Sequence, residues 1–269
     1  MIEIAIGFAI AFSVGLTGLG GGSFTTPVLV LLMGLPAAAA VATALAFSAV
    51  LRVIAAPFHL IGRNVRAHCF WPLVLGGLPG LIAGVYFLRD LSRAQWSPLL
   101  LILLGILLVL TAALSLWGPH RSRAHPAAAA APRSRRPRAW LALLALPIGM
   151  ETGFSSAGSG ALGVVALMNF TDLTAAEAVG TDLLFGCVLA IAGAAWSAGF
   201  GLTQLTVLAR LLVGGIPGVL LGCFLGRRLP ARRLRAVVMM IVLVLGFSLV
   251  WSGLRTPAAP GEAAAVNPR

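Results

Sequence analysis

The sequence predicts an all-α polytopic membrane protein made of two pseudo-symmetric repeats, each with about four hydrophobic helical segments. The chain is 59% hydrophobic and only 10% charged, and its mean hydropathy of +1.02 lies outside the usual range of soluble globular domains. Its apolar stretches each reach the roughly 20 residues that cross a bilayer as a helix. They cover residues 4–33, 37–61, 69–88, 96–117, 140–168, 178–198, 207–226 and 236–254. None of them alternates polar and apolar residues with a period of two, which argues against a transmembrane β-barrel.

The repeat is visible when the chain is shifted against itself by 138 residues. Residues 35–51 then align with 173–189, and residues 76–91 align with 214–229. The second alignment reproduces a pattern of glycines and one proline that a general richness in alanine and leucine does not explain. The sequence therefore divides into a first repeat, a basic Pro/Ala/Arg-rich linker that we expect to be cytoplasmic, a second repeat and a disordered tail. These regions are 1–117, 118–139, 140–256 and 257–269, respectively.

The first apolar segment is interrupted by GLTGLGGGSF at residues 15–24. Each glycine in a helix interior costs about 1 kcal/mol relative to alanine, so this run predicts that the helix breaks or turns back there. A broken helix is tolerated in lipid only where its freed backbone amides are buried in protein or line a cavity. The matching stretch GFSSAGSGAL at 153–162 predicts a second break. Glu3 and the lack of a basic amino-terminal region predict a retained first helix rather than a signal peptide.

Hydroxyl side chains gather at both predicted breaks. The amino ends of half-helices present free N–H groups and a positive dipole, which suit an anionic substrate in transporters built from repeats. We therefore predict that the two breaks form one substrate-binding site. Its candidate residues are Thr17, Gly20, Gly21, Gly22, Ser23, Thr25 and Thr26 at the first break and Ser155, Ser156 and Ser159 at the second. The alternative is that the glycines only permit close helix packing and the hydroxyls cap the broken ends.

Charged residues inside apolar segments are costly and are usually functional. Arg52 stands within the segment 37–61, and its repeat counterpart is Ala190. Asp182 lies in the equivalent segment of the second repeat, and Glu151 precedes the second break. We expect Arg52 to bind the anion and either Asp182 or Glu151 to bind a coupling proton. A structural ion pair between Arg52 and Asp182 would give the same sequence.

Two membrane topologies are compatible with these segments. Eight full crossings would place the basic residues 227–235 on the side opposite the linker. If the first segment of each repeat turns back or does not cross, each repeat crosses three times and the two repeats are inverted. Residues 62–68, the linker and residues 227–235 then share one side, which is the placement that the positive-inside rule favours. We therefore prefer the inverted arrangement.

Other kinds of chemistry have little support in the sequence. Cys69, Cys187 and Cys223 stand singly in apolar surroundings and are expected to be packing residues. His59 has no second ligand at a metal-binding spacing, and no GxSxG, HExxH or P-loop motif is present, so we expect no metal, no cofactor and no enzymatic activity. The net charge of +12 comes largely from arginines in loops beside apolar segments. That pattern orients a membrane protein and does not indicate nucleic-acid binding.

These motifs resemble the sulfite exporter TauE/SafE family of bacterial membrane transporters, also called the toluene sulfonate uptake permeases. The resemblance rests on 15-GLTGLGGGSFTTP-27, on Thr43, and on 59-HLIGRNV-65, in which Gly and Arg are exchanged relative to the family's loop. In the second repeat, 153-GFSSAGSG-160 and 180-GT-181 correspond. The resemblance adds Thr43 and Thr181 to the substrate-binding candidates. The second repeat departs from the family pattern because Ala157 and Ser159 replace glycines and Asp182 adds a charge.

The resemblance implies secondary transport of a small sulfur-containing anion, such as sulfite, sulfoacetate or a related sulfonate, across the bacterial inner membrane by alternating access. The expected partners are this anion, the lipid bilayer and a coupling proton, without nucleic acid, and the oligomeric state is left open. Two other functions also stay open. An anion channel would need a continuous polar pore, and a membrane assembly partner would transport nothing.

Overall fold

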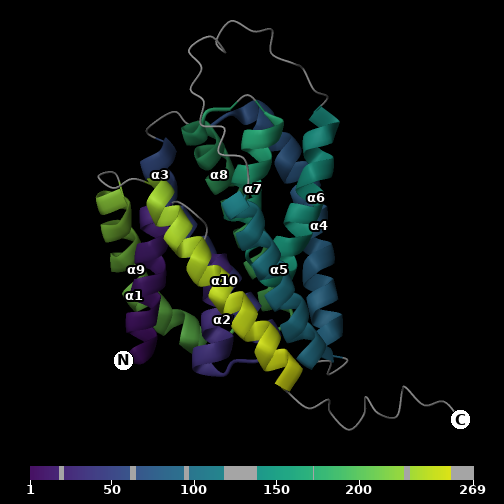
Figure 1. Ribbon diagram of the computed structural model, residues 1–269, viewed down its shortest axis with the longest axis vertical. Helices are drawn as coiled ribbons and strands as arrows, with labels where there is room; N and C mark the ends of the chain where they lie inside the picture. Colours follow the sequence, from purple (N-terminus) through teal and green to yellow (C-terminus); the bar gives the residue numbers. More distant parts are fainter. Residues whose placement is uncertain are drawn as a thin grey trace, which may run out of the picture.

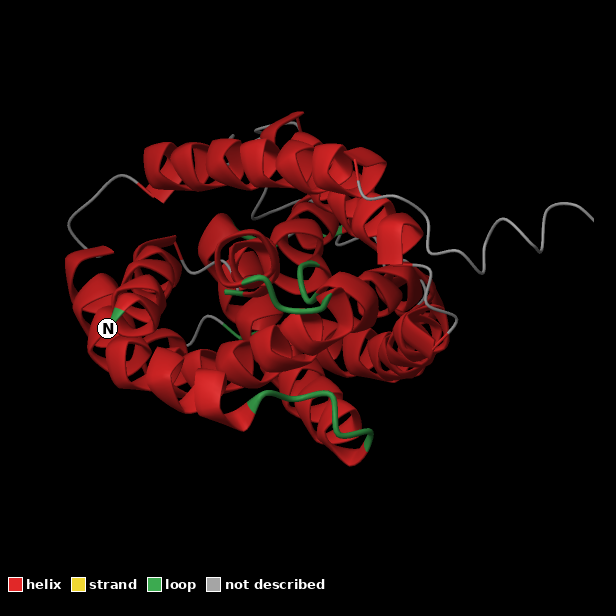
Figure 2. Cartoon of the chain, turned by 90° about the horizontal axis from the view of Figure 1, so that it is seen from below, coloured by secondary structure: helices red, strands yellow, loops and turns green. Residues whose placement is uncertain are grey.

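The structure is a computed structural model, and it describes residues 1–17, 21–60, 65–93, 97–117, 138–171, 173–226 and 231–255. Every regular element in these ranges is a helix, as Figure 2 shows. The helices are α1 (Ile2–Thr17), α2 (Gly22–Met33), α3 (Ala37–Leu60), α4 (Ala67–Arg93), α5 (Ser97–Trp117), α6 (Arg138–Ser155), α7 (Gly158–Phe170), α8 (Ala175–Gly199), α9 (Leu205–Gly226) and α10 (Ala231–Arg255). The all-α prediction is confirmed. The predicted linker and tail lie almost wholly outside the described residues, so their boundaries stay predictions.

Six of the described helices are long and apolar enough to cross a membrane, namely α3, α4, α5, α8, α9 and α10. The apolar helices α1, α2 and α6 are shorter. The first and fifth apolar stretches of the sequence are each divided into two helices, α1–α2 and α6–α7, whereas each of the other stretches forms one helix. The chain is therefore a polytopic helical membrane protein in which two segments are broken.

The two halves of the structure contain the same order of helices. Helix α3 begins at Ala37 and α8 begins at Ala175, which is 138 residues later. Helix α5 ends at Trp117 and α10 ends at Arg255, which is again 138 residues later. The sequence repeat thus corresponds to five helices in each half, and two of the five come from the broken segment.

Each broken segment packs against a long helix of the other half. Helix α1 lies along α9, and α6 lies along α4 (Figure 1). A Cβ atom added at Gly214 would lie 1.9 Å from the carbonyl oxygen of Ile4, and one added at Gly76 would lie 1.9 Å from that of Ala142. Only glycine allows such backbone contact between helices. The glycines shared by residues 76–91 and 214–229 are therefore explained by packing between the halves.

The two halves run in opposite directions. Helices α3 and α8 are repeat counterparts, and they cross antiparallel because Gly186 of α8 lies against Arg52 whereas Gly193 lies against Leu45. Helices α5 and α10 are also counterparts, and their glycine contacts likewise run in opposite order along the two chains. Since counterparts point in opposite directions, the two halves are related by an exchange that turns one of them over.

The broken segments turn back on themselves. Successive glycine contacts show that α6 runs parallel to α4 and that α4 runs parallel to α8. Helix α7 connects the parallel helices α6 and α8, so it returns the chain toward the end at which α6 began. In Figure 1, α2 returns in the same way between α1 and α3. The α1–α2 and α6–α7 segments are therefore helical hairpins, and each half keeps three long helices.

Helices α3 and α8 occupy the centre of this arrangement. Their counterpart residues Phe47 and Phe185 are both fully buried. The ring of Phe47 contacts Gly215 of α9, and the ring of Phe185 contacts Gly77 of α4. Because the two central helices face each other across the halves, any side chain on their shared surface lies in the interior of the protein.

Candidate functional site

The two helix breaks meet inside the protein. Gly22, at the start of α2, lies so close to Ser156 that an added Cβ atom would come within 1.7 Å of the Ser156 carbonyl oxygen. The Ser156 hydroxyl donates to the Gly22 carbonyl oxygen at 3.0 Å. The Thr26 hydroxyl oxygen lies 2.7 Å from that of Ser156 and 3.1 Å from the Ser155 carbonyl oxygen. The structure thus brings the predicted break residues of both repeats together at one place, which we call the break contact.

The local backbone explains why the second segment breaks there. Ser156 has a positive φ of 64°, which is uncommon for a residue other than glycine. Four residues later, Gly160 has φ 111°, a conformation that side chains disfavour. The residues that precede α2 and α7, Gly21 and Ala157, make no side-chain capping bond. The first backbone N–H groups of both helices are therefore left for other partners.

Most hydroxyls near the break contact bond to carbonyl oxygens that the breaks release. Ser23 donates to the Ala157 carbonyl at 3.4 Å, and Thr25 donates to the Gly21 carbonyl at 2.6 Å. Ser155 donates to the Glu151 carbonyl at 3.0 Å. All of these hydroxyl side chains are buried. The capping role that the sequence left open for them is therefore met in this structure.

Arg52 of α3 reaches the second break. Its Nη2 atom donates to the Ser159 carbonyl oxygen at 2.9 Å and lies 3.1 Å from the Ser159 hydroxyl oxygen. Its Nε atom donates to the Ser48 hydroxyl at 3.2 Å. The side chain crosses between α3 and α8 over Gly186, where an added Cβ atom would lie 1.5 Å from Nη1. Arg52 is only 2% exposed, so a cationic group is fixed in the interior beside the break.

Asp182 of α8 is also buried near this group. Gly163 of α7 leaves room for its carboxylate, since an added Cβ atom there would lie 1.7 Å from Asp182 Oδ1. The Asp182 carboxylate is close enough to act on the Arg52 guanidinium electrostatically. The two opposite charges predicted from the sequence therefore share one region, and both depend on glycines of the second half for space.

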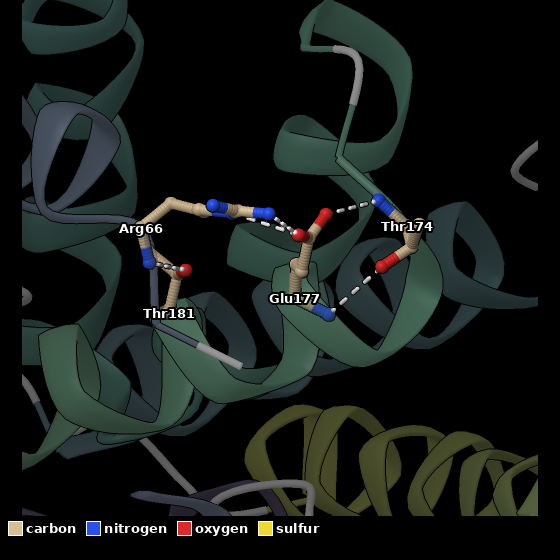
Figure 3. A network of polar contacts seen from close by, with 4 residues as sticks. All are labelled: Arg66, Thr174, Glu177 and Thr181. Carbon is tan, nitrogen blue, oxygen red and sulfur yellow. Dashed lines mark hydrogen bonds and ion pairs between the residues drawn. The ribbon is translucent and has the colours of Figure 1, made fainter. Parts of the chain in front are cut away.

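Thr43 and Thr181 have a different role from the break residues. The Thr43 hydroxyl accepts a hydrogen bond from the backbone N–H of Gln204 at 3.1 Å. Its counterpart Thr181 accepts one from the backbone N–H of Arg66 at 3.2 Å (Figure 3). These two bonds are related by the same 138-residue exchange. The structure places both threonines against the connections that precede α9 and α4 and does not bring their hydroxyls to the break contact.

The Arg66–Thr181 bond is part of a larger network at the start of α8. The Arg66 guanidinium forms an ion pair with Glu177, with Nε 2.7 Å from Oε1. Glu177 and Thr174 form a reciprocal capping box at the amino end of the helix, drawn in Figure 3. The opposite end of the protein, at Thr43 and Gln204, has alanine at the position that corresponds to Glu177. Only one of the two equivalent ends therefore has this ion pair.

The remaining predicted residues are placed as follows. Thr17, at the end of α1, donates to the Ser13 carbonyl at 2.8 Å. Gly20 lies outside the described residues, and so does most of the predicted GRNV loop. Glu151 is buried one turn before the second break and contacts Thr111 of α5 rather than Arg52. Sequence reasoning missed Ser48 and Thr111; the spacing of four between Ser48 and Arg52 on one helix was the available signal for the first.

Comparison with known proteins places this arrangement in a family. A sequence model described as Sulfite exporter TauE/SafE matches residues 3–249. The chain belongs to this family. It is 29% identical over 257 residues to "Probable membrane transporter protein YjnA" of Bacillus subtilis, a match that covers 92% of this chain and 98% of that protein. It is also 28% identical over 264 residues to a "Probable membrane transporter protein" of Xylella fastidiosa strain Temecula1, covering 93% and 95%. No solved structure matches this TauE/SafE chain significantly.

Proposed function

We propose that this TauE/SafE protein is a secondary transporter that moves a small anion, with a sulfur oxyanion or an organosulfonate as the expected class, across the bacterial inner membrane by alternating access. The family description names a sulfite exporter, and the relatives are named as membrane transporters. Six long apolar helices, three in each half, provide the crossings. The substrate class rests on the family description together with the chemistry of the break contact.

The observation that carries the proposal is the position of Arg52. A buried arginine within a membrane segment is costly and is usually retained for a substrate, an ion or a buried partner. The guanidinium donates to Ser159 at the break and has no acidic side chain bonded to it among the described residues. Planar guanidinium groups form paired, charge-assisted bonds with oxyanions. A sulfite or sulfonate group that entered the break contact would therefore replace Ser159 as the partner of Arg52.

The two hairpins would add backbone donors to this site. Helices α2 and α7 both begin at the break contact, and neither has a side-chain cap. Their free N–H groups and the positive ends of their dipoles favour an anion at this place. The hydroxyls of Thr26 and Ser156 would rotate from their present carbonyl partners to donate to the oxygens of the anion. The substrate would thus be held by both halves at once.

Contacts between the halves suggest how the site would open to each side in turn. The Thr43–Gln204 and Thr181–Arg66 bonds lie at opposite ends of the protein, because α3 and α8 run antiparallel. Both bonds are formed here, and the break residues are buried, so this structure corresponds to an occluded state. In the proposed cycle, one of the two bonds opens when the site faces its own side. The arginine-rich segments 62–68 and 227–235 would face the cytoplasm.

The proposal is tested by transport with purified protein in proteoliposomes. Labelled sulfite and a labelled small alkanesulfonate should be taken up at a rate that saturates with concentration. The Arg52→Ala variant should lose this uptake, and Arg52→Lys should keep only part of it because lysine cannot form the paired bonds. Arg255→Ala is the matched control, since Arg255 lies over the Trp251 ring at the far end of α10.

The outcomes of this experiment separate the candidate functions. Full uptake by Arg52→Ala would remove Arg52 from the substrate site. Currents beyond roughly a thousand ions per second for each protein would indicate a channel, because conformational cycles on the μs–ms scale are slower. No transport of any sulfur anion, by protein that is folded and correctly inserted, would contradict the proposed function.

A further inference from the structure

Glu151 is a buried acid that the proposed anion site does not use. It lies on α6, one turn before the second break, and is 6% exposed. Its side chain faces α5, where Oε1 is in hydrogen-bonding contact with the Thr111 hydroxyl. The Thr111 hydroxyl also lies 2.7 Å from the carbonyl oxygen of Leu107 in its own helix. One hydroxyl oxygen therefore touches two oxygen atoms of other groups.

The number of protons in this contact is informative. The Thr111 hydroxyl has a single hydrogen, and both the Leu107 carbonyl and an ionised Glu151 can only accept. If Glu151 were ionised, one of the two contacts would bring acceptor against acceptor. If the Glu151 carboxyl holds a proton, it donates to Thr111, and Thr111 donates to the Leu107 carbonyl. The geometry therefore fits a protonated carboxyl, with every group satisfied.

The surroundings of Glu151 also lack a compensating charge. None of the charged side chains that the structure describes on the neighbouring long helices acts on its carboxyl electrostatically. These side chains are Arg89, Asp90 and Arg93 on α4 and Glu177 and Asp182 on α8. Helices α2, α5 and α7 contribute no charged residue in their own spans. An ionised carboxylate here would be a buried charge without a cation, which is strongly unfavourable.

We propose that Glu151 is the proton-binding site that couples a proton gradient to anion transport, an inference that rests on the proposed transport function. The sequence left Asp182 and Glu151 as alternatives. The structure separates them, because Asp182 lies beside the guanidinium of Arg52 whereas Glu151 has only a hydroxyl partner. The repeat counterparts of Glu151 and Thr111 are Ser13 and Leu249, so only the second half carries this site.

The position of Glu151 gives the proton a route to the break contact. The carboxyl holds its proton while α6 is packed against α5. Release of the proton to water requires these helices to part, since the ionised form needs solvation. Ser155 bonds back to the Glu151 carbonyl, and the Ser155 carbonyl contacts Thr26 of the other hairpin. Movement of α6 would therefore be transmitted to the place where the anion binds.

The test uses proteoliposomes and a small alkanesulfonate, whose charge does not change with pH over the range used. Two assays are compared: uptake driven by an imposed pH gradient, and exchange of labelled for unlabelled anion without a gradient. In Glu151→Gln, a neutral amide replaces the protonated carboxyl with similar shape and hydrogen-bonding capacity. This variant should retain exchange but lose acceleration by the gradient. A pH-sensitive dye inside the vesicles should report proton flux with anion flux for the original protein and none for the variant.

Thr111→Val provides a second variant that keeps the acid but removes its partner, and it should shift the pH at which the gradient effect is half maximal. Ser13→Ala, at the repeat counterpart of Glu151, is the matched control and should behave like the original protein. Gradient-driven uptake by Glu151→Gln equal to that of the original protein would overturn the proposal. Anion exchange that ignores the gradient in the original protein would also overturn it while leaving the transport function standing. Absence of both activities in the original protein would instead count against the transport function itself.

Discussion

The hydroxyl oxygens of Thr26 and Ser156 lie 2.7 Å apart although 130 residues separate them in the chain. Thr26 belongs to the first hairpin and Ser156 to the second, so this contact joins the two halves at the point where each helix is broken. Because both side chains are buried, water does not replace a lost partner easily. The break contact is therefore a place where small changes in side chains should affect the whole protein.

The first prediction concerns this pair. Thr26→Val and Ser156→Ala should each destabilise the protein, and the double variant should lose less than the sum, with a coupling free energy of about 0.5–3 kcal/mol. Thermal unfolding in detergent measures the four members of the cycle. Thr26→Val combined with Thr174→Ala is the control pair, since Thr174 caps α8 and shares no bond with Thr26. Simple additivity for Thr26 and Ser156 would contradict the contact.

Gly22 should be intolerant of any side chain. Its added Cβ atom would meet the backbone of Ser156, which cannot rotate away. We expect Gly22→Ala to lower the free energy of unfolding by about 1–3 kcal/mol or more. Gly199→Ala, at a helical glycine with no neighbouring atom within 4 Å, should leave the stability nearly unchanged. Equal melting temperatures for the two variants would mean that the breaks do not touch.

Gly186 should control the binding of the anion by positioning Arg52. A Cβ atom at this residue would lie 1.5 Å from Nη1, so the guanidinium must leave its place above α8. We expect Gly186→Ala to weaken anion binding at least about tenfold, which corresponds to about 1.4 kcal/mol. Anion-induced thermal stabilisation measures the change, with Gly199→Ala on the same helix as control. Unchanged stabilisation by the anion would show that the guanidinium position does not matter.

The network at Glu177 allows two contributions to be separated. Glu177→Gln can keep the capping box with Thr174 while removing the ion pair with Arg66, and should cost about 0.2–1 kcal/mol, less at high salt. Glu177→Ala removes both, so it should cost about a further 0.5–2 kcal/mol regardless of salt. Melting temperatures at low and high salt distinguish the two variants. Identical losses in both would mean that the capping box contributes nothing.

The direction of the helices predicts where engineered cysteines react. Helix α4 ends and α10 begins at opposite ends of the structure (Figure 1). In a background that lacks the three native cysteines, Asp90→Cys and Arg232→Cys should react with impermeant reagents from opposite sides of the membrane. The Arg232 position should react from the cytoplasm. Reaction of both positions from one side would favour eight full crossings instead.

Several features of the candidate site follow from local sequence patterns. The breaks were predictable because clustered glycines destabilise a helix whatever surrounds them. The buried charges at Arg52, Asp182 and Glu151 were recognisable because they interrupt apolar segments. The partners of these residues were not predictable, since Ser159 is 107 residues from Arg52 and Thr111 is 40 residues from Glu151. Such contacts depend on how distant helices cross.

The sequence by itself determined that this protein is a polytopic helical membrane protein of the TauE/SafE family with two broken segments. The physical reason is that hydropathy and helix propensity act residue by residue along the chain. Only the tertiary structure decided that the glycines of residues 76–91 and 214–229 serve packing between the halves, and that Thr43 and Thr181 bond to backbone amides. It also decided that Arg52 faces a break whereas Glu151 faces Thr111. Those assignments come from antiparallel counterpart helices whose contacts join residues far apart in the chain, and no local pattern specifies them.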